Sequence, residues 1–414
     1  MGLTAQGRDY AATPARGAST SDLDPLEFDR FRKMAAAGKG DRTLAELSNQ
    51  ELLRSLRLIL PEHDNALTIG AILLFGTEDA LGRYVPTAEA VFQELRRDSV
   101  TTNETIRQPL FRAAERLFEL IMVRNSEQEL MIGLHRVGVP RVPEGTIRES
   151  IANALVHRDY SEVGPISVQL RENTFRVASP GGFPAGITLK NFLDDSKPRS
   201  PILAEAFKRA GIVDRAGRGI REMYVQLLRT GRSGPDYSKS NANSVIVQIS
   251  TSDADLDMVR FVLDYEGADG RTLLLPQLQV LHELKAMGPQ TTGELVEALH
   301  DTESAVRTHI ARLVEMGLVE SRGPGRNRRH HLTAAFYRVA QSSEYVRLQD
   351  TDPIQQEHMI MAYVDQFGSI TRGKAAELCH LSPGQARVVL KRLTEARQLE
   401  LRGEKRGAHY VRPT

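Results

Sequence analysis

A carboxylate, an amide and an imidazole recur every four residues along one predicted helix, over 146–158. Glu149, Asn153 and His157 fall on one face of this helix, because residues four apart align. An amide oxygen suits Mg²⁺, which keeps several waters and binds readily beside nucleotide phosphates. Glu149 is placed to accept a proton from an attacking water. A solvated polar face with an acid near the helix start would show the same pattern.

Two glycine-rich segments follow, and both suit close approach of the backbone to a ligand. Gly181 and Gly182 come directly after a predicted strand. Gly217, Arg218 and Gly219 precede a predicted helix, whose free N–H groups and dipole favour an anion. A simple turn and a glycine-capped connection between helices explain the two segments equally well.

Two other nucleotide motifs do not occur in the sequence. It contains no GxxxxGK[ST] segment, which excludes a P-loop and with it the usual helicase motor. It also lacks a GxGxxG segment between a strand and a helix, which argues against a dinucleotide-binding Rossmann site.

An internal repeat fills the C-terminal part of the chain, over 272–340 and 353–414. Each copy reads as a helix, a short helix, a longer helix and a two-stranded wing. Polar residues stand where the second and third helices of each copy begin, namely Thr291, Thr302, Thr371 and Ser382. This order predicts two tandem winged helix-turn-helix domains.

Such domains insert their third helix into the major groove of double-stranded DNA and grip phosphates with the wing. The candidate base-contacting residues are Ser304, Arg307, Thr308 and Arg312 in the first copy and Gln385, Arg387 and Lys391 in the second. The basic wing residues are Arg322, Arg326, Arg328 and Arg329, joined by His330 and His331, and in the second copy Arg402, Lys405 and Arg406. A solvated basic loop, or a winged helix used for protein contacts, would have the same composition.

Composition supports an ordinary globular protein of 414 residues, with 41% hydrophobic and 26% charged residues. The net charge is only +1, but residues 272–414 carry three more basic than acidic side chains. A single cysteine, Cys379, excludes an intrachain disulfide and reads as a buried small hydrophobe. The longest apolar stretch, 67–76, is too short to span a bilayer. These features predict a cytoplasmic protein without a membrane partner.

Helices mixed with antiparallel hairpins over 140–250 indicate an α+β two-layer domain. Upstream, 24–60 and 104–125 read as helical, the second of these interrupted early by Pro109, whereas 67–76 fits either a buried helix or a strand. Residues 1–23 lack periodicity and read as a flexible leader.

Taken in order, the segments ESIANALVHRDY, SPGGFPAGIT and DRAGRGIREMY resemble the three motifs of the GHKL-type ATPase fold. More narrowly, residues 25–250 resemble the RecG-related, or RecG C-terminal-like, ATP-binding transcriptional regulators. The resemblance implies a GHKL-like α/β two-layer sandwich before the winged helices, without a helicase motor. Members of that family usually begin with an AlbA-type domain, of which 1–23 would be only a remnant.

The resemblance also implies roles for individual residues. Asn153 would bind Mg²⁺ and phosphate, Glu149 would activate water, and His157 and Arg158 would line the same pocket. Gly181 and Gly182 would lie beside the adenine of ATP, whereas Gly217, Arg218 and Gly219 would lie over the phosphates. The wider fold places an aspartate before the first glycine pair to read the adenine amino group, and here Ser179 stands in that place.

These expectations divide the chain into a leader (1–23), an N-terminal α/β part (24–140), a GHKL-like ATP-binding domain (141–252) and two winged helices (272–340 and 353–414). They predict a homodimeric DNA-binding transcriptional regulator that couples the binding of ATP and Mg²⁺ to DNA binding. Two alternatives stay open. One is an ATP-hydrolysing enzyme of DNA maintenance or defence, and the other is a pseudo-ATPase scaffold for dimerisation.

Overall fold

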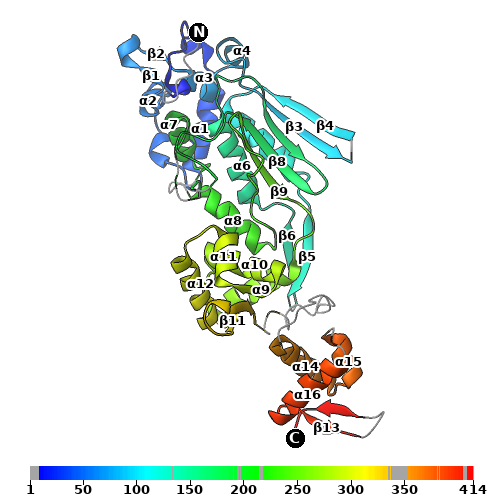
Figure 1. Ribbon diagram of the computed structural model, residues 1–414. Helices are drawn as coiled ribbons and strands as arrows, with labels where there is room; N and C mark the ends of the chain where they lie inside the picture. The colour runs from blue at the N-terminus through cyan, green and yellow to red at the C-terminus, as the bar shows by residue number, and fades with distance from the viewer. Residues whose placement is uncertain are drawn as a thin grey trace. The chain divides into compact units, whose positions relative to one another are not determined.

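The computed structural model divides the chain into two compact units, residues 1–256 and 257–414 (Figure 1). The residues that the structure describes are 9–97, 99–132, 134–189, 191–193, 195, 197–213, 218–333, 336, 353–379, 381, 383–403 and 408–413.

The first unit is built on a five-stranded sheet. Its strands, in spatial order, are β4 (Ser99–Ile106), β3 (Ala90–Arg96), β7 (Ile166–Leu170), β8 (Thr174–Pro180) and β9 (Ser244–Ser250). Strands β3 and β7 are parallel, and every other neighbouring pair is antiparallel. Alternate side chains such as Phe92, Val168 and Val177 are buried, as expected for a sheet with one covered face. The sequence-based α+β assignment for this region is therefore confirmed.

Helices α5 (Leu110–Met122) and α6 (Glu144–His157) pack against each other and against this sheet. Figure 1 shows α6 beside the strands. Two further helices, α7 (Pro201–Arg209) and α8 (Gly219–Arg229), contact α6. Hydrogen bonds reinforce the packing, because the Thr146 hydroxyl of α6 donates to the Gln226 side chain of α8 over 3.1 Å. The two-stranded pair β5 (Glu127–Ile132) and β6 (His135–Pro140) lies between α5 and α6 in the chain.

The N-terminal part of this unit is mostly helical. Its elements are η1 (Tyr10–Ala12), η2 (Thr20–Asp22), α1 (Pro25–Ala36), η3 (Arg42–Leu44), α2 (Asn49–Ser55), β1 (Ile59–Leu60), η4 (Pro61–His63), β2 (Ala66–Leu67), α3 (Ile69–Phe75) and α4 (Glu78–Tyr84). Aromatic rings join α1, α3 and α5, since Phe75 stacks on Phe28 with ring centroids 4.3 Å apart and also contacts Phe31 and Phe111. The 67–76 stretch thus contributes a buried helix.

Two expectations for the N-terminal part are wrong. The predicted helix over 104–125 begins only at Leu110, because Pro109 cannot continue a helix and the preceding residues pair in β4. The leader prediction fails for residues 9–23, where Ala11 and Ala15 are buried in the core and Asp9 accepts hydrogen bonds from the start of α7. Residues 1–8 lie outside the described residues.

The second unit begins with α9 (Leu256–Asp269) and continues with the first copy of the repeat. Its elements are α10 (Leu275–Met287), β10 (Gln290–Thr291), α11 (Thr292–Leu299), α12 (Glu303–Glu315), β11 (Val319–Arg322), η5 (Gly325–Asn327) and β12 (Arg329–Leu332). The three strands form a sheet in the order β10-β12-β11. The predicted N-caps are confirmed, because Thr291 and Thr302 each accept a backbone N–H at the start of α11 and α12.

The second copy also has three helices followed by a β-hairpin. It consists of α14 (Pro353–Phe367), α15 (Arg372–Leu378), α16 (Pro383–Glu395), β13 (Glu400–Arg402) and β14 (His409–Val411). Thr371 caps α15 as predicted, whereas Ser382 lies outside the described residues. Cys379 is buried in this core, as predicted, and burial raises the pKa of its thiol to about 12.

We predict that Phe75→Ala destabilises the first unit by about 3–5 kcal/mol, since it removes a fully buried ring from the aromatic cluster. The measurement is the free energy of unfolding in urea. Leu26→Ala, at an exposed position of α1, is the control and should change that free energy by less than about 0.5 kcal/mol. Equal effects of the two substitutions would contradict the described core.

Candidate functional site

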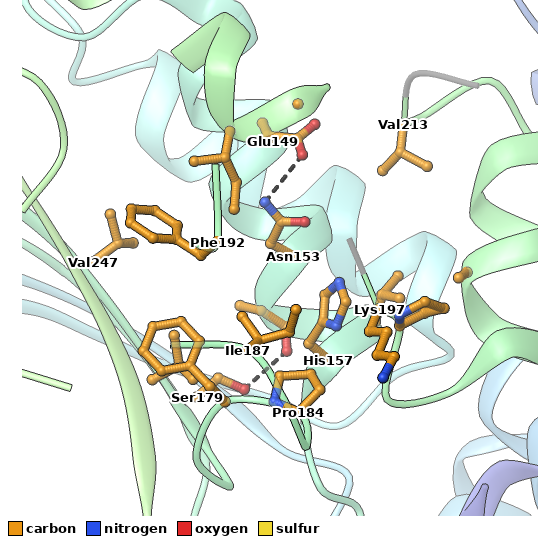
Figure 2. Close-up of a pocket in the computed structure, with 18 of the residues that line it drawn as sticks. Glu149, Asn153, His157, Ser179, Pro184, Ile187, Phe192, Lys197, Val213 and Val247 are labelled. Carbon is orange, nitrogen blue, oxygen red and sulfur yellow. Dashed lines mark hydrogen bonds between the residues drawn. The ribbon is translucent and has the colours of Figure 1, made fainter. Parts of the chain in front are cut away.

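The first unit contains a cavity of about 470 Å³ (Figure 2). Its walls are α6, the ends of β8 and β9, several described residues between Phe183 and Pro198, and the facing sides of α7 and α8. Most of the lining is apolar, and the polar and charged groups come mainly from α6, α7, α8 and the segment before α7. A cavity of this kind is the usual form of a site for a small organic ligand.

The polar face of α6 turns into this cavity. Glu149, Asn153 and His157 all line it, stacked along the helix as their spacing predicts (Figure 2). Asn153 Nδ2 donates to Glu149 Oε1 over 3.0 Å, which directs the amide. In the part of the chain that the structure describes, no hydrogen bond to Asn153 Oδ1 is formed within the protein, so this oxygen is available to a ligand or cation.

The carboxylate of Glu149 lies against the first residue of α8. A Cβ atom added to Gly219 would overlap this carboxylate, so a larger residue here would displace Glu149 and with it the bond to Asn153. The start of a helix favours negative charge, which accounts for the position of Glu149. Arg218 precedes α8 as an exposed residue that does not line the cavity, and Gly217 lies outside the described residues.

His157 is the last residue of α6 and lies at the end of the polar face that is farther from Glu149. The backbone N–H of Arg199 donates to His157 Nδ1 over 3.4 Å, so the ring proton belongs on Nε2. Burial and the nearby Arg199 cation lower the pKa of His157 to about 4. The imidazole is therefore neutral at neutral pH.

Aromatic and aliphatic side chains form the other side of the cavity. Phe183, Phe192 and Tyr237 contact one another with ring centroids 5.1–6.3 Å apart. Branched aliphatic residues continue this surface along β8 and β9, among them Val177, Val245 and Val247. Burial raises the pKa of Tyr237, so its phenol stays neutral. This surface suits a flat apolar group such as a base.

Ser179 lines the cavity next to this apolar surface. Its hydroxyl donates to the carbonyl oxygen of Ala154 over 3.0 Å and so ties β8 to α6 (Figure 2). A hydroxyl has a single proton, so Ser179 can face a ligand only as a hydrogen-bond acceptor in this arrangement.

Neither glycine of the first pair lines the cavity. Gly181 has a φ of +91°, and a Cβ atom there would lie 2.7 Å from the Cβ of Asp159. A Cβ atom on Gly182 would lie 2.6 Å from the carbonyl oxygen of Ala242. In this structure both glycines allow the turn to pack against its own chain.

The prediction that Arg158 lines the pocket is wrong. Its side chain is 1% exposed and lies on the other side of the end of α6. The guanidinium is held there by a ring and by backbone carbonyl oxygens, because it lies 4.8 Å from the Tyr160 ring and donates to Thr87, Asp159, Glu162 and Gly164. Arg158 is therefore a structural residue that joins the loop after α6 to the segment at Thr87.

Three cavity residues carry positive charge and were not predicted from the sequence, namely Lys197, Lys208 and Arg221. An acidic neighbour partly offsets this positive charge, since Lys208 Nζ lies 3.8 Å from Glu205 Oε2. Lysine and arginine on a loop or an amphipathic helix are common on protein surfaces, so no sequence signal distinguished them.

In the second unit, the predicted recognition residues of the first copy lie on the exposed side of α12. Ser304, Thr308 and Arg312 are exposed, as is Arg307, which donates twice to Glu303 (2.6 and 3.0 Å). On the wing, Arg328 and Arg329 are exposed and donate to the carbonyl oxygens of Gly323 and Pro289. Arg322 is half-buried, and the side chain of Arg326 lies outside the described part.

His330 and His331 do not belong to the wing tip, because both are buried at its base. The ring of His330 joins the Thr292 hydroxyl (3.0 Å) to the Ser321 hydroxyl (2.8 Å) and so links β12 to α11 and β11. The interpretation of these histidines as part of a phosphate-gripping tip is therefore wrong.

The second copy presents a similar surface. Gln385, Arg387 and Lys391 are exposed on α16, and Lys391 lies 3.5 Å from Glu395. Arg402 is exposed on β13 and lies 3.5 Å from Glu400. Lys405 and Arg406 lie outside the described residues.

Three segments match known families. Residues 164–249 match "Putative ATP-dependent DNA helicase recG C-terminal". Residues 277–321 match "Bacterial regulatory protein, arsR family", and residues 4–91 match a domain of unknown function (DUF8451). The chain therefore has the RecG-related architecture that its motifs resemble, an ATPase-like domain joined to an ArsR-type helix-turn-helix domain. This combination indicates a DNA-binding regulator.

One similar solved structure is the DIP2311 protein from Corynebacterium diphtheriae. It is 22% identical, with a TM-score of 0.64, and the match covers 98% of this chain and 70% of that chain. The similarity extends the shared fold over nearly the whole sequence. A search of curated proteins gives no match. In the described part of the chain, no helix is both long and apolar enough to cross a membrane.

We predict that Arg158→Met lowers the free energy of unfolding by about 3 kcal/mol or more, because it leaves buried carbonyl oxygens without donors. Urea denaturation measures this change. Arg148→Met, on the exposed side of α6, is the control and should have little effect. A stable Arg158→Met protein would contradict the structural role.

Proposed function

We propose that this protein is a transcriptional regulator whose first unit has a GHKL-like ATP-binding domain and whose second unit contains two winged helices that bind DNA. The observation that carries the proposal is the Glu149–Asn153 pair, which lines a largely apolar cavity next to the start of α8. We further propose that nucleotide binding changes DNA affinity.

The polar end of the cavity fits a nucleotide with its cation. Asn153 Oδ1 is a hard oxygen donor that would bind Mg²⁺, with Glu149 beside it. Among the described residues no cluster of three His, Cys, Asp or Glu side chains could hold a metal, so phosphate oxygens would have to complete the coordination. Lys197 and Arg221 line the same cavity and would offset the phosphate charge.

The apolar side fits an adenine base. Ser179 can accept a hydrogen bond but has no free proton to donate, which favours an amino group such as adenine N6 over a carbonyl oxygen. A neutral hydroxyl binds an amino group more weakly than a carboxylate does. We therefore expect a preference for adenine that is weaker than an aspartate would give.

The second unit fits DNA in both copies of its repeat. Each copy has three helices followed by a β-hairpin, which is the order of a winged helix-turn-helix. Polar and basic residues lie on the exposed side of α12 and α16, where such domains contact bases. A homodimer would place two such readers on a palindromic site.

ATP hydrolysis is a second candidate activity. Glu149 lies within hydrogen-bond distance of Asn153 and so would stand close to a nucleotide phosphate group and its attacking water. Phosphate release by the unmodified protein would support this activity, which is compatible with regulation. A pseudo-ATPase scaffold would bind no nucleotide at all.

The nucleotide proposal predicts that Asn153→Ala weakens the binding of ATP with Mg²⁺ by about tenfold or more, because a cation ligand is lost. Glu149→Gln should keep nucleotide binding and abolish any phosphate release. Isothermal titration calorimetry and a phosphate-release assay provide the two measurements. Arg148→Ala, on the exposed side of the same helix, is the control. No binding by the unmodified protein at millimolar ATP would refute the proposal.

For DNA, we predict that the triple variant Arg326→Ala, Arg328→Ala and Arg329→Ala weakens binding to all sequences. It should also reduce the salt dependence of log Kd by about one per lost phosphate contact. Arg307→Ala should instead change which sequences are preferred. Fluorescence anisotropy at several salt concentrations measures both effects.

A triple alanine variant at Arg83, Arg107 and Arg112 is the matched control, since it removes the same number of positive charges from exposed side chains of the first unit. If the wing variant and this control have the same salt dependence, the wing does not bind phosphates.

A further inference from the structure

We propose that Arg199 is a positioning residue of the cavity, which holds the His157 ring so that its Nε2–H group faces the ligand. It also joins this end of α6 to the turn at Gly182. The identity of the ligand rests on the proposed nucleotide function, whereas the positioning itself does not. Nothing in the sequence motifs marks Arg199, because it lies outside the three segments that carry the family resemblance.

Arg199 makes four hydrogen bonds with three residues of the first unit, His157 and Asp159 at the end of α6 and Gly182 in the turn after β8. Its backbone N–H donates to His157 Nδ1 (3.4 Å), and its Nε donates to the His157 carbonyl oxygen (2.9 Å). Its Nη1 donates to Asp159 Oδ2 (3.2 Å), and its Nη2 donates to the Gly182 carbonyl oxygen (2.5 Å). The rigid guanidinium fork can satisfy the three oxygen acceptors together, which a lysine cannot do.

The surroundings of Arg199 are built to accept this side chain. Gly181 leaves room for it, since a Cβ atom there would lie 3.3 Å from Arg199 Nη2. The next residue, Ser200, begins α7 and donates to Asp9 Oδ2 over 2.9 Å, while the Ile202 N–H donates to the same oxygen over 3.3 Å. Asp9 thus anchors the backbone on one side of Arg199, and His157 anchors it on the other.

These contacts decide what His157 can offer a ligand. With Nδ1 accepting from Arg199, the proton belongs on Nε2, which makes no hydrogen bond within the described part of the chain. The ring lies between Asn153 and Lys197 in the cavity wall (Figure 2). An N–H donor beside a lysine ammonium suits an oxygen-rich group, such as a ribose or a phosphate of the nucleotide.

The charges around His157 favour its neutral form. Arg199 is the nearest cation, and Lys197 and Lys208 also line this part of the cavity. The nearby carboxylates are engaged elsewhere, because Asp159 pairs with Arg199, and Glu205 pairs with Arg209 over 2.7 Å and with Lys208. Burial and the Arg199 cation lower the pKa of His157 to about 4, so its donor role is constant between pH 5.5 and 8.

The first test is nuclear magnetic resonance of the histidine ring nitrogens in the full chain, with His157→Gln to assign the signal. In the unmodified protein we expect the His157 ring to carry its proton on Nε2 and none on Nδ1, and we expect this ring not to titrate above about pH 5. In Arg199→Gln the backbone N–H at position 199 remains but loses the side-chain bonds that fix its place, so both ring tautomers should be present. The pKa of His157 should rise only in part, because burial is the larger cause of its low value. Arg124→Gln is the matched control, since Arg124 has similar exposure and also bonds a carboxylate and a carbonyl oxygen.

The second test is the affinity for ATP with Mg²⁺ between pH 5.5 and 8. We expect a pH-independent Kd for the unmodified protein, and for Arg199→Gln a Kd that is about tenfold higher and varies with pH. If Arg199→Gln does not fold, Arg199→Lys serves instead. It keeps the charge but loses the fork, so it should show mixed tautomers and weakened affinity.

An unchanged His157 tautomer and pKa in Arg199→Gln, or an Arg199→Lys protein identical to the unmodified one, would overturn the positioning role. The resonance measurement needs no nucleotide. The unmodified protein could show the expected His157 tautomer and yet bind no ATP. That result would refute the proposed function and leave the role of Arg199 intact.

Discussion

The burial of α6 is the constraint on which the first unit depends. Ile147, Ile151 and Leu155 face the core, so only one narrow side of the helix is left for polar groups. Glu149, Asn153 and His157 occupy that side, and the cavity forms where α7, α8 and the segment after β8 close over it. Any change that rotates α6 would move all three residues at once, because they share one rigid helix. The positions of these three residues therefore depend on how tightly α6 packs.

Several residues that look like ligand contacts serve to hold this arrangement. Gly219 makes space for the Glu149 carboxylate, and Gly182 makes space for the backbone near Ala242. Ser179 fastens β8 to α6 through the carbonyl oxygen of Ala154. A glycine allows close approach whether the neighbour is a ligand or the protein itself, so the sequence pattern alone cannot separate the two.

Local patterns predicted much of the fold and part of the site. Periodicity identified α6, the β7–β8 hairpin and the repeated helices of the second unit, because these elements depend on residues close in sequence. The spacing of Glu149, Asn153 and His157 also predicted that they share one wall of the cavity.

Features that depend on distant segments of the chain could not be predicted from the sequence. Arg158 donates to a carbonyl oxygen 71 positions away, and Lys208 reaches the cavity only because α7 packs beside α6. Pro109 marked the true start of α5, yet the strand before it became clear only from its pairing with β3.

The most direct test of the account is a crystal structure of the protein with a non-hydrolysable ATP analogue and Mg²⁺. The account predicts the cation at Asn153 Oδ1, the phosphates beside Asn153 at the start of α8, and the base against Val177 with its amino group on Ser179. A cavity without analogue, or a base at the Glu149 end with the phosphates against the aromatic side chains, would contradict it.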